Sequence, residues 1–218
     1  MFHSEKELVD LILKRFNNKW ISIKKYNKEN IEIITEINLW FWIPDIVIVN
    51  KKSKEHSDRT THLNSFDISV LDVIRREKGI SIDDIVNVTK ARKEKINNSL
   101  SILVNESIIT ERKGKEYEFN NYNTCISDCI AIEVKLKNRR RALNQAYRYK
   151  WFANESYVLL PESNINPAMN NIDLFKKINV WLLGINEKMD IKIYNKVNKE
   201  KPISDKMFFL LNEYFIKK

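Results

Sequence analysis

The stretch Ile130-Ala131-Ile132-Glu133-Val134-Lys135-Leu136 is the part of the sequence from which the fold can best be inferred. Its aliphatic and β-branched residues favour a buried strand. Alternate residues of a strand share one face, so Glu133 and Lys135 are expected to point the same way. The pattern therefore predicts a carboxylate and an ammonium group next to each other on one strand of a sheet.

A second apolar strand, with an acidic residue at its leading end, is predicted earlier in the chain. Asp45 to Val49 follows the breaker Pro44, and only β-branched residues come after the aspartate. Two stretches rich in β-branched and aromatic residues, 20–26 and 31–40, predict strands ahead of it. The run Trp40-Phe41-Trp42 suits a core better than a base-stacking platform, because aromatic residues of strands are usually buried.

Helical patterns precede and follow these strands. Ser4 and Glu7 form a capping-box pattern, and apolar residues at helical spacing predict a first helix from about Glu5 to Phe16. The sequence after Lys135 predicts a helix, a strand, a short helix, two strands and a last helix, in the ranges 139–152, 157–160, 173–177, 180–185, 190–194 and 204–217.

The region between the two halves of the predicted sheet has a different pattern. Residues 51–65 contain one aliphatic side chain and predict a linker. Residues 66–122 predict three short helices, the second opened by Ser81 and the third capped by Thr89, and then a hairpin with the tip Lys113-Gly114-Lys115. Three short helices followed by a hairpin is the order of a winged helix-turn-helix.

The expected fold is therefore of the α/β (α+β) class, a mixed central sheet flanked by helices and interrupted by a winged-helix insert. Residues 1–50 and 123–218 would form the sheet domain. An insert can be accommodated in a surface loop when the ends of the guest module lie close together.

The acidic and basic residues of the two central strands suit phosphodiester hydrolysis. Such a reaction needs hard cations that neutralise charge on the phosphoryl oxygens and generate hydroxide near neutral pH. Asp45 and Glu133 could bind Mg²⁺ from neighbouring strands, with the Val134 carbonyl as a further ligand. Lys135 could orient the attacking water or take its proton, and Gln145 could position a water or the phosphate from the following helix.

Pro44-Asp45 at a strand start, followed by Glu133-x-Lys135 on a later strand, resembles the PD-(D/E)XK nuclease superfamily. Gln145-Ala146 with Tyr149 is similar to the glutamine-containing helix of several of its branches. The resemblance implies a restriction-endonuclease-like core and a Mg²⁺-dependent DNA endonuclease, with Mn²⁺ as a substitute, that leaves a 5′-phosphate and a 3′-hydroxyl.

The N-terminal sequence Glu5-Lys6-Glu7-Leu8-Val9 is similar to the first helix of archaeal Holliday-junction resolvases, whose leading glutamate joins the metal site. This likeness implies Glu5 as a further site residue. Glu7 is the competing choice.

Two groups of polar and basic residues are candidates for DNA contact. Those of the insert would lie on its third helix and wing, namely Arg92, Lys93, Lys95, Asn97, Asn98, Lys113 and Lys115. Those beside the proposed site are Arg139, Arg140, Arg141 and Arg148. The alternatives are that both groups are solvated surface, and that the insert docks a protein partner.

Composition limits the class of protein without identifying it. The chain has 218 residues and a net charge of +9, but it contains 28 Lys, 26 Asn and 30 Ile, residue types with AT-rich codons, so codon bias can supply much of the lysine. No apolar run is long enough to cross a membrane. The opening residues show no secretory signal, and Cys125 and Cys129 suit reduced structural thiols better than a zinc site, which favours the cytoplasm.

DNA is the expected partner, and a homodimer is compatible with cutting two strands. The competing hypothesis is a catalytically silent DNA-binding or protein-recruiting module on a nuclease-like fold.

Overall fold

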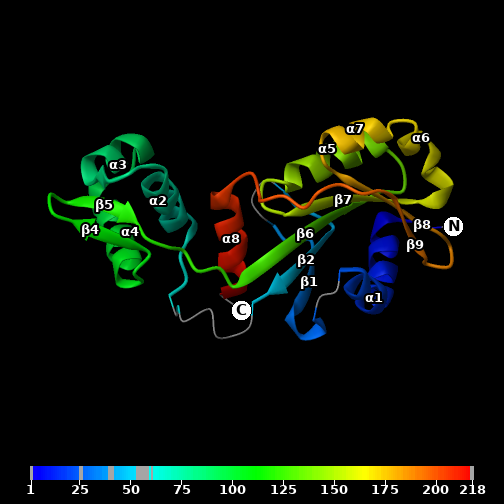
Figure 1. The fold of residues 1–218 in the computed structure, drawn as a ribbon, viewed down its shortest axis with the longest axis horizontal. Coiled ribbons are helices and arrows are strands. Elements are labelled where there is room, and N and C mark those ends of the chain that lie inside the picture. The colour runs from blue at the N-terminus through cyan, green and yellow to red at the C-terminus, as the bar shows by residue number, and fades with distance from the viewer. Residues whose placement is uncertain (1, 25–26, 39–41, 53–58, 60, 217–218) are drawn as a thin grey trace. The chain divides into compact units, whose positions relative to one another are not determined.

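A computed structural model of the protein describes all residues except 1, 25–26, 39–41, 53–58, 60 and 217–218 (Figure 1). The chain forms two compact units. We call residues Met1–Lys52 and Ile126–Ser204 the sheet unit, and residues Ser53–Cys125 and Asp205–Lys218 the helical unit. Each unit has a hydrophobic core of its own.

The sheet unit is built on a six-stranded mixed sheet in the order β1-β2-β6-β7-β8-β9. The central pairs β6–β7 and β7–β8 are parallel, and the pairs β1–β2, β2–β6 and β8–β9 are antiparallel. The strands are β1 (Ile31–Thr35), β2 (Ile46–Lys51), β6 (Ile126–Val134), β7 (Glu155–Pro161), β8 (Trp181–Ile185) and β9 (Ile191–Asn195).

Helices cover both faces of this sheet. Alternate strand residues such as Ile132 and Leu159 pack on one face with Leu8 and Ile12 of α1 (Glu5–Lys24). Residues of the opposite parity pack on the other face with α5 (Arg139–Tyr149) and α7 (Ile172–Lys177). Figure 1 shows the same arrangement, with α5, α6 and α7 on one side and α1 on the other. The remaining short helices of the unit are η1 (Lys28–Asn30), η3 (Glu162–Asn164) and α6 (Asn166–Met169).

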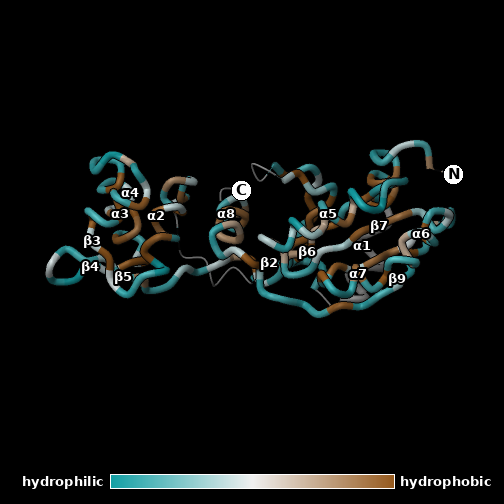
Figure 2. The backbone as a smooth tube through the Cα atoms, turned by 90° about the horizontal axis from the view of Figure 1, so that it is seen from above, coloured by the Kyte–Doolittle hydropathy of each residue, from teal (hydrophilic) through white to brown (hydrophobic). Residues whose placement is uncertain are grey.

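The described residues of the helical unit form four helices and a small antiparallel sheet in the order β3-β5-β4. Its helices are α2 (Ser65–Arg76), α3 (Ile82–Thr89), α4 (Lys93–Asn105) and α8 (Asp205–Ile216). Its strands are β3 (Ile80–Ser81), β4 (Ile109–Arg112) and β5 (Glu116–Phe119). The turn between β4 and β5 is hydrophilic (Figure 2), and Gly114 adopts a φ of 97° there, a conformation that glycine takes without a Cβ clash.

A buried polar network ties α8 to the start of the helical unit. The Glu213 carboxylate of α8 pairs with Arg59, accepts a hydrogen bond from the Leu63 amide at 2.9 Å and accepts another from the Tyr122 hydroxyl at 2.5 Å. Burial and the Glu213 charge raise the pKa of Tyr122, so its hydroxyl remains a donor.

The mixed α/β class with a central mixed sheet flanked by helices is confirmed. Several local expectations differ from the structure. Residues 20–24, predicted as part of a strand, continue helix α1, because the uninterrupted helix favours its own hydrogen bonds over strand propensity. Residues 25–26, at the end of that predicted strand, and residues 39–41, which include Trp40 and Phe41, lie outside the described part.

Two expected boundaries are also corrected. Thr89 is the last residue of α3, where its hydroxyl donates to the Ile85 carbonyl, and Arg92 precedes α4 as its cap residue. The last helix was expected in the sheet domain, but α8 buries Phe209 in the core of the helical unit. Among the described residues, no helix is long and apolar enough to span a membrane.

Replacing Glu213 with Gln should lower the free energy of unfolding by about 3 kcal/mol, because it leaves the Arg59 guanidinium buried without its carboxylate. Urea denaturation measures the change. Asp173→Asn, an acidic residue whose side chain is 94% exposed, is the control and should unfold like the wild type. Equal stability of Glu213→Gln and the control would show that the network does not hold α8 in place.

Candidate functional site

The sheet register brings Asp45 and Glu133 to the same edge of the sheet unit. Strands β2 and β6 are antiparallel, and Ile46 is paired with Ile132. One step further along both strands places Asp45 next to Glu133. The Asp45 carboxylate accepts a hydrogen bond from the Val134 amide at 2.7 Å. This bond joins the Asp45 side chain to the end of β6.

Lys135 lies at the centre of this acidic edge. Its Nζ is 2.7 Å from Glu133 Oε1, 3.0 Å from Glu5 Oε2 and 3.8 Å from Asp45 Oδ2. The same ammonium group donates to the Val134 carbonyl at 3.1 Å. The structure therefore brings four of the predicted site residues, and the predicted carbonyl, to one point.

Between the two candidate glutamates of α1, the structure places Glu5 in the cluster. Glu7 instead accepts a hydrogen bond from the His3 amide at 2.9 Å, near the start of the helix. The Glu7 amide is held by the Ser4 hydroxyl at 3.0 Å, which completes the N-terminal cap and orients the first turn. Glu5 lies on that first turn and reaches Lys135.

Burial disfavours the charged forms of Asp45 and Glu133. Burial raises the pKa of Asp45, and the Val134 hydrogen bond and the Lys135 charge oppose the rise. Glu133 is fully buried; burial and the neighbouring Asp45 charge raise its pKa, while Lys135 and Tyr149 counteract them. Both groups would thus gain from a further positive charge.

Lys135 is held in its charged form. Burial alone would lower the pKa of the ammonium group, but the carboxylates of Glu133, Asp45 and Glu5 outweigh burial and raise it above its ordinary value. Of the two roles expected for Lys135, a charged group that orients water or stabilises negative charge suits this environment better than a base.

Helix α5 supplies two further polar groups to the site. The Tyr149 hydroxyl donates to Glu133 Oε2 and lies 3.5 Å from the Ile43 carbonyl. Burial and the Glu133 charge raise the pKa of Tyr149 and keep its proton in place. Gln145, one turn earlier, is half-buried, and its Oε1 accepts no hydrogen bond from the described residues. The role of Tyr149 was not assigned from the sequence, although its spacing of four from Gln145 places both on one helix face.

The donor set suits a hard cation in its chemistry, since it consists of carboxylate and carbonyl oxygens. The described residues contain no group of three or more His, Cys, Asp or Glu side chains arranged to hold a metal by themselves. A Mg²⁺ ion would therefore depend on Asp45, Glu133 and the Val134 carbonyl together with water and substrate oxygens, a mode that this ion accepts.

The arginines predicted beside the site lie on α5. Arg139, Arg140, Arg141 and Arg148 are all exposed, and none of them pairs with an acidic side chain in the described part of the chain. A surface hollow of about 470 Å³ is lined by Asn138, Arg140, Arg141, Asn144, Gln145 and Arg148. It extends from the start of α5 to the glutamine next to the acidic cluster.

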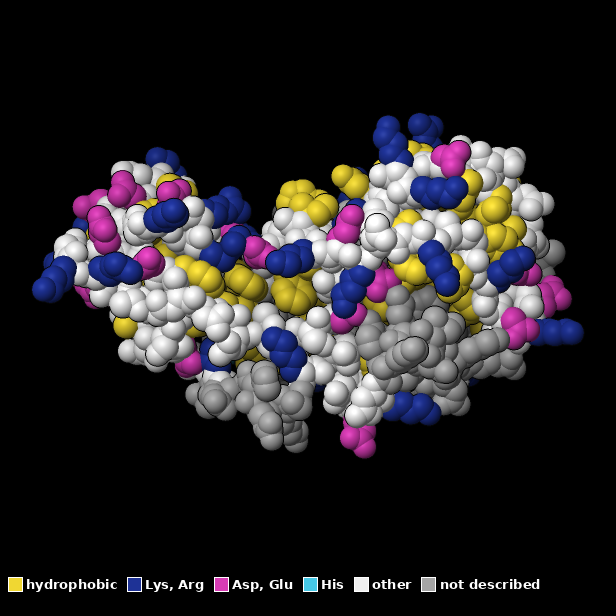
Figure 3. Space-filling model, viewed as in Figure 1, with side chains coloured by type: hydrophobic (Ala, Val, Ile, Leu, Met, Phe, Trp, Pro, Cys, Tyr) yellow, Lys and Arg dark blue, Asp and Glu magenta, His cyan; other side chains and the backbone are white. Residues whose placement is uncertain are grey.

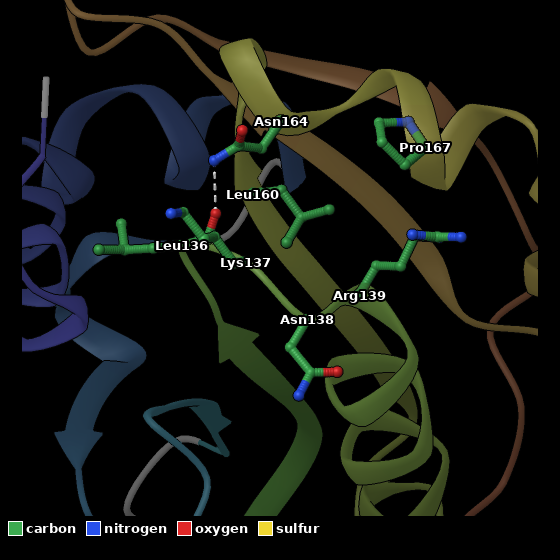
Figure 4. A pocket seen from close by; sticks show the side chains of 7 residues that line it. All are labelled: Leu136, Lys137, Asn138, Arg139, Leu160, Asn164 and Pro167. Atoms are coloured by element: carbon green, nitrogen blue, oxygen red, sulfur yellow. Dashed lines mark hydrogen bonds between the residues drawn. The ribbon is translucent and has the colours of Figure 1, made fainter.

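A smaller hollow of about 170 Å³ lies where the chain leaves β6 and enters α5 (Figure 4). It is lined by polar and basic side chains, among them Lys137 and Arg139, and by Leu160 and Pro167. Asn164 closes one side by donating to the Leu136 carbonyl at 2.6 Å.

In the helical unit the predicted DNA-contact residues are exposed, but several are engaged. Lys93 pairs with Asp83 at 2.7 Å, and Lys95 lies 4.0 Å from the centre of the Phe66 ring. Arg92 and the Lys113 and Lys115 pair of the wing are exposed. Basic and acidic side chains are interspersed on the face drawn in Figure 3, so the net charge does not form one patch there.

Cys125 and Cys129 are not joined in a disulfide, and the described residues contain no group of three or more His, Cys, Asp or Glu side chains that could hold a metal ion. Trp42 was grouped with the core, but it is only half-buried and meets the exposed Trp151.

Comparisons with models of protein families, with curated proteins and with solved structures found no match for this chain. The function of the protein is therefore inferred from the geometry and chemistry of the residues described above.

Replacing Lys135 with Met should destabilise the protein by about 3 kcal/mol at neutral pH, because it leaves buried carboxylates without their cation. The deficit should shrink as the pH falls. The pKa values of Asp45 and Glu133 are raised in the folded protein, so protonation favours the fold, and this contribution is lost as pH rises through those pKa values.

Urea denaturation of Lys135→Met and the wild type across a range of acidic to neutral pH measures this difference. Lys176→Met, a lysine whose side chain is 57% exposed, is the matched control. A deficit that is independent of pH, or that grows in acid, would mean that the carboxylates do not depend on Lys135.

Proposed function

We propose that the protein is a Mg²⁺-dependent DNA endonuclease whose sheet unit hydrolyses phosphodiester bonds. The observation that carries the proposal is the convergence of Asp45, Glu133 and Glu5 on the Lys135 ammonium group, within 3.8 Å in every case. These residues come from α1, the start of β2 and the end of β6. The sequence pattern predicts Asp45, Glu133 and Lys135 for one site, and the resemblance adds Glu5 with Glu7 as the alternative.

Each of these residues has a separate role in such a reaction. When bound, Mg²⁺ supplies charge neutralisation at the phosphoryl oxygens and a more acidic water. Asp45, Glu133 and the Val134 carbonyl are the groups that would hold it. Lys135, kept charged by its neighbours, orients the attacking water and favours the negative charge that develops on the phosphate.

Helix α5 supports the same site. Tyr149 holds the Glu133 carboxylate by a hydrogen bond from its hydroxyl, so the carboxylate cannot rotate freely. The buried amide oxygen of Gln145 has no partner in the described structure, which suits a bound water that donates to it. The arginines of α5 would hold the DNA backbone beside the site.

The helical unit would contribute DNA affinity or targeting as a winged helix-turn-helix. Three helices and the β4–β5 hairpin follow one another in the order of that module. Helix α4 is the element that would enter the major groove, and the turn with Lys113 and Lys115 is the wing that would contact phosphate.

One observation favours a second candidate, a catalytically silent DNA-binding or protein-recruiting module. The Lys135 ammonium already pairs with all three carboxylates, and a buried ion-pair cluster of this kind can serve structure alone. Metal-dependent cleavage separates the two candidates.

Incubation of the protein with plasmid, branched and single-stranded DNA should give cleavage of at least one of these substrates with Mg²⁺ and none with EDTA. Asp45→Asn and Lys135→Met should each lower the cleavage rate by about a thousandfold or more, since each removes a group that acts on the reacting phosphate. Asp173→Asn and Lys176→Met are the exposed controls and should cut at the wild-type rate. Binding without cutting on every substrate would support the silent module. Cutting that survives Asp45→Asn would show that this site is not the one that cuts.

Replacing Arg92 with Ala should weaken duplex DNA binding uniformly across sequences and reduce the slope of log affinity against log salt by about 1, because one phosphate contact is lost. Fluorescence anisotropy at several salt concentrations measures both quantities, with Lys176→Met as the control. Unchanged affinity and slope would favour a protein partner for the helical unit.

A further inference from the structure

A pair of tryptophan rings forms an aromatic surface next to the candidate site. The ring centroids of Trp42 and Trp151 are 6.1 Å apart, and the ring planes are tilted by 38°. Trp151 is 42% exposed and Trp42 is half-buried. The neighbouring Ile43 is 54% exposed, so the rings lie in an apolar patch open to water.

This aromatic surface is connected to the acidic cluster through short links. The Ile43 carbonyl lies 3.5 Å from the Tyr149 hydroxyl, which donates to Glu133. Trp151 follows Tyr149 by two residues, and its amide donates to the Arg148 carbonyl at 3.2 Å. Phe152, the next residue, is fully buried against Tyr149, so the chain turns one aromatic ring inward and leaves the other outward.

A row of polar and basic side chains leads along α5 toward the same place. Arg141, Gln145 and Arg148 have the spacing i, i+4 and i+7 and therefore share one side of the helix. All three line the hollow of about 470 Å³. The two arginines are exposed and form no ion pair with the acidic side chains that the structure describes.

Unpaired arginines next to exposed aromatic rings are the features with which proteins bind single strands. The cations track the phosphate backbone, and the bases stack on the rings. In a duplex the faces of the bases are covered by their neighbours, so exposed rings gain little from it. A structural role alone would call for burial of Trp151, because an exposed indole contributes little to a core.

We propose that the candidate site acts on single-stranded DNA, whose bases stack on Trp151 and Trp42 while Arg141 and Arg148 hold its phosphates. The assignment of a substrate class rests on the proposed nuclease function. The stacking surface itself can be tested without any cleavage, so that the two proposals can fail separately.

The test measures the affinity of a labelled oligothymidylate of about 12 nucleotides, by fluorescence anisotropy in EDTA, and of a duplex of equal length under the same conditions. Trp151→Ala should weaken single-strand binding by about tenfold or more and leave duplex binding unchanged. Trp151→Phe should restore most of the affinity, because the ring is kept. Tyr214→Ser, which removes an exposed aromatic ring from α8, is the matched control and should bind like the wild type.

A change in the probe gives a second measurement that needs no variant. Replacing successive thymines by abasic sites keeps the phosphates and removes the rings that stack, so it should weaken binding to the wild type by a similar factor. The same replacement should reduce the affinity of Trp151→Ala much less. The proposal would be overturned if neither Trp151→Ala nor the abasic sites changed the affinity for single-stranded DNA. It would also be overturned if Trp151→Ala reduced the affinity for single-stranded and duplex DNA equally. Binding as expected without metal-dependent cleavage would refute the nuclease and leave the stacking surface in place.

Discussion

The ion pairs of Lys135 stabilise the buried carboxylates at the acidic edge of the sheet unit. A carboxylate as fully buried as that of Glu133 is unstable without a compensating charge, and Asp45 adds a second negative charge next to it. Lys135 pairs with both carboxylates, and it also reaches Glu5 on the first turn of α1. One ammonium group thereby joins the N-terminal helix, the entry of β2 and the exit of β6.

The same electrostatics connect stability with the proposed chemistry. Burial raises the pKa of Asp45 and Glu133, and an added cation would relieve the repulsion between them. A protein that needed only a stable sheet could place apolar side chains at this edge at less cost in desolvation. The retained cluster, the Tyr149 hydrogen bond to Glu133 and the unpartnered oxygen of Gln145 are easier to explain as parts of a site than as parts of a core.

The sheet unit and the helical unit use buried charge in different ways. In the helical unit, Glu213 is satisfied by Arg59, the Leu63 amide and the Tyr122 hydroxyl, and the result is a closed network that fastens α8. In the sheet unit, the acidic cluster borders an arginine-lined hollow and a pair of tryptophans, of which Trp151 is exposed and Trp42 is half-buried. A closed network is typical of structure, whereas an open cluster with charged surroundings is typical of a site.

The sequence by itself determined the strand with Glu133 and Lys135 on one face, the strand led by Asp45, and the helix that carries Gln145, because alternation and helical spacing are local properties. It also selected Asp45, Glu133 and Lys135 for one site, whereas the choice between Glu5 and Glu7 stayed open until the structure placed Glu5 against Lys135. Local patterns could not show that residues 20–24 continue a helix, that α8 belongs to the helical unit, or that Trp151 meets Trp42. The first outcome reflects the hydrogen bonds of an uninterrupted helix, which outweigh local strand propensity. The other two depend on packing between segments far apart in the chain, where tertiary contacts choose which apolar face is covered and which is left open to water.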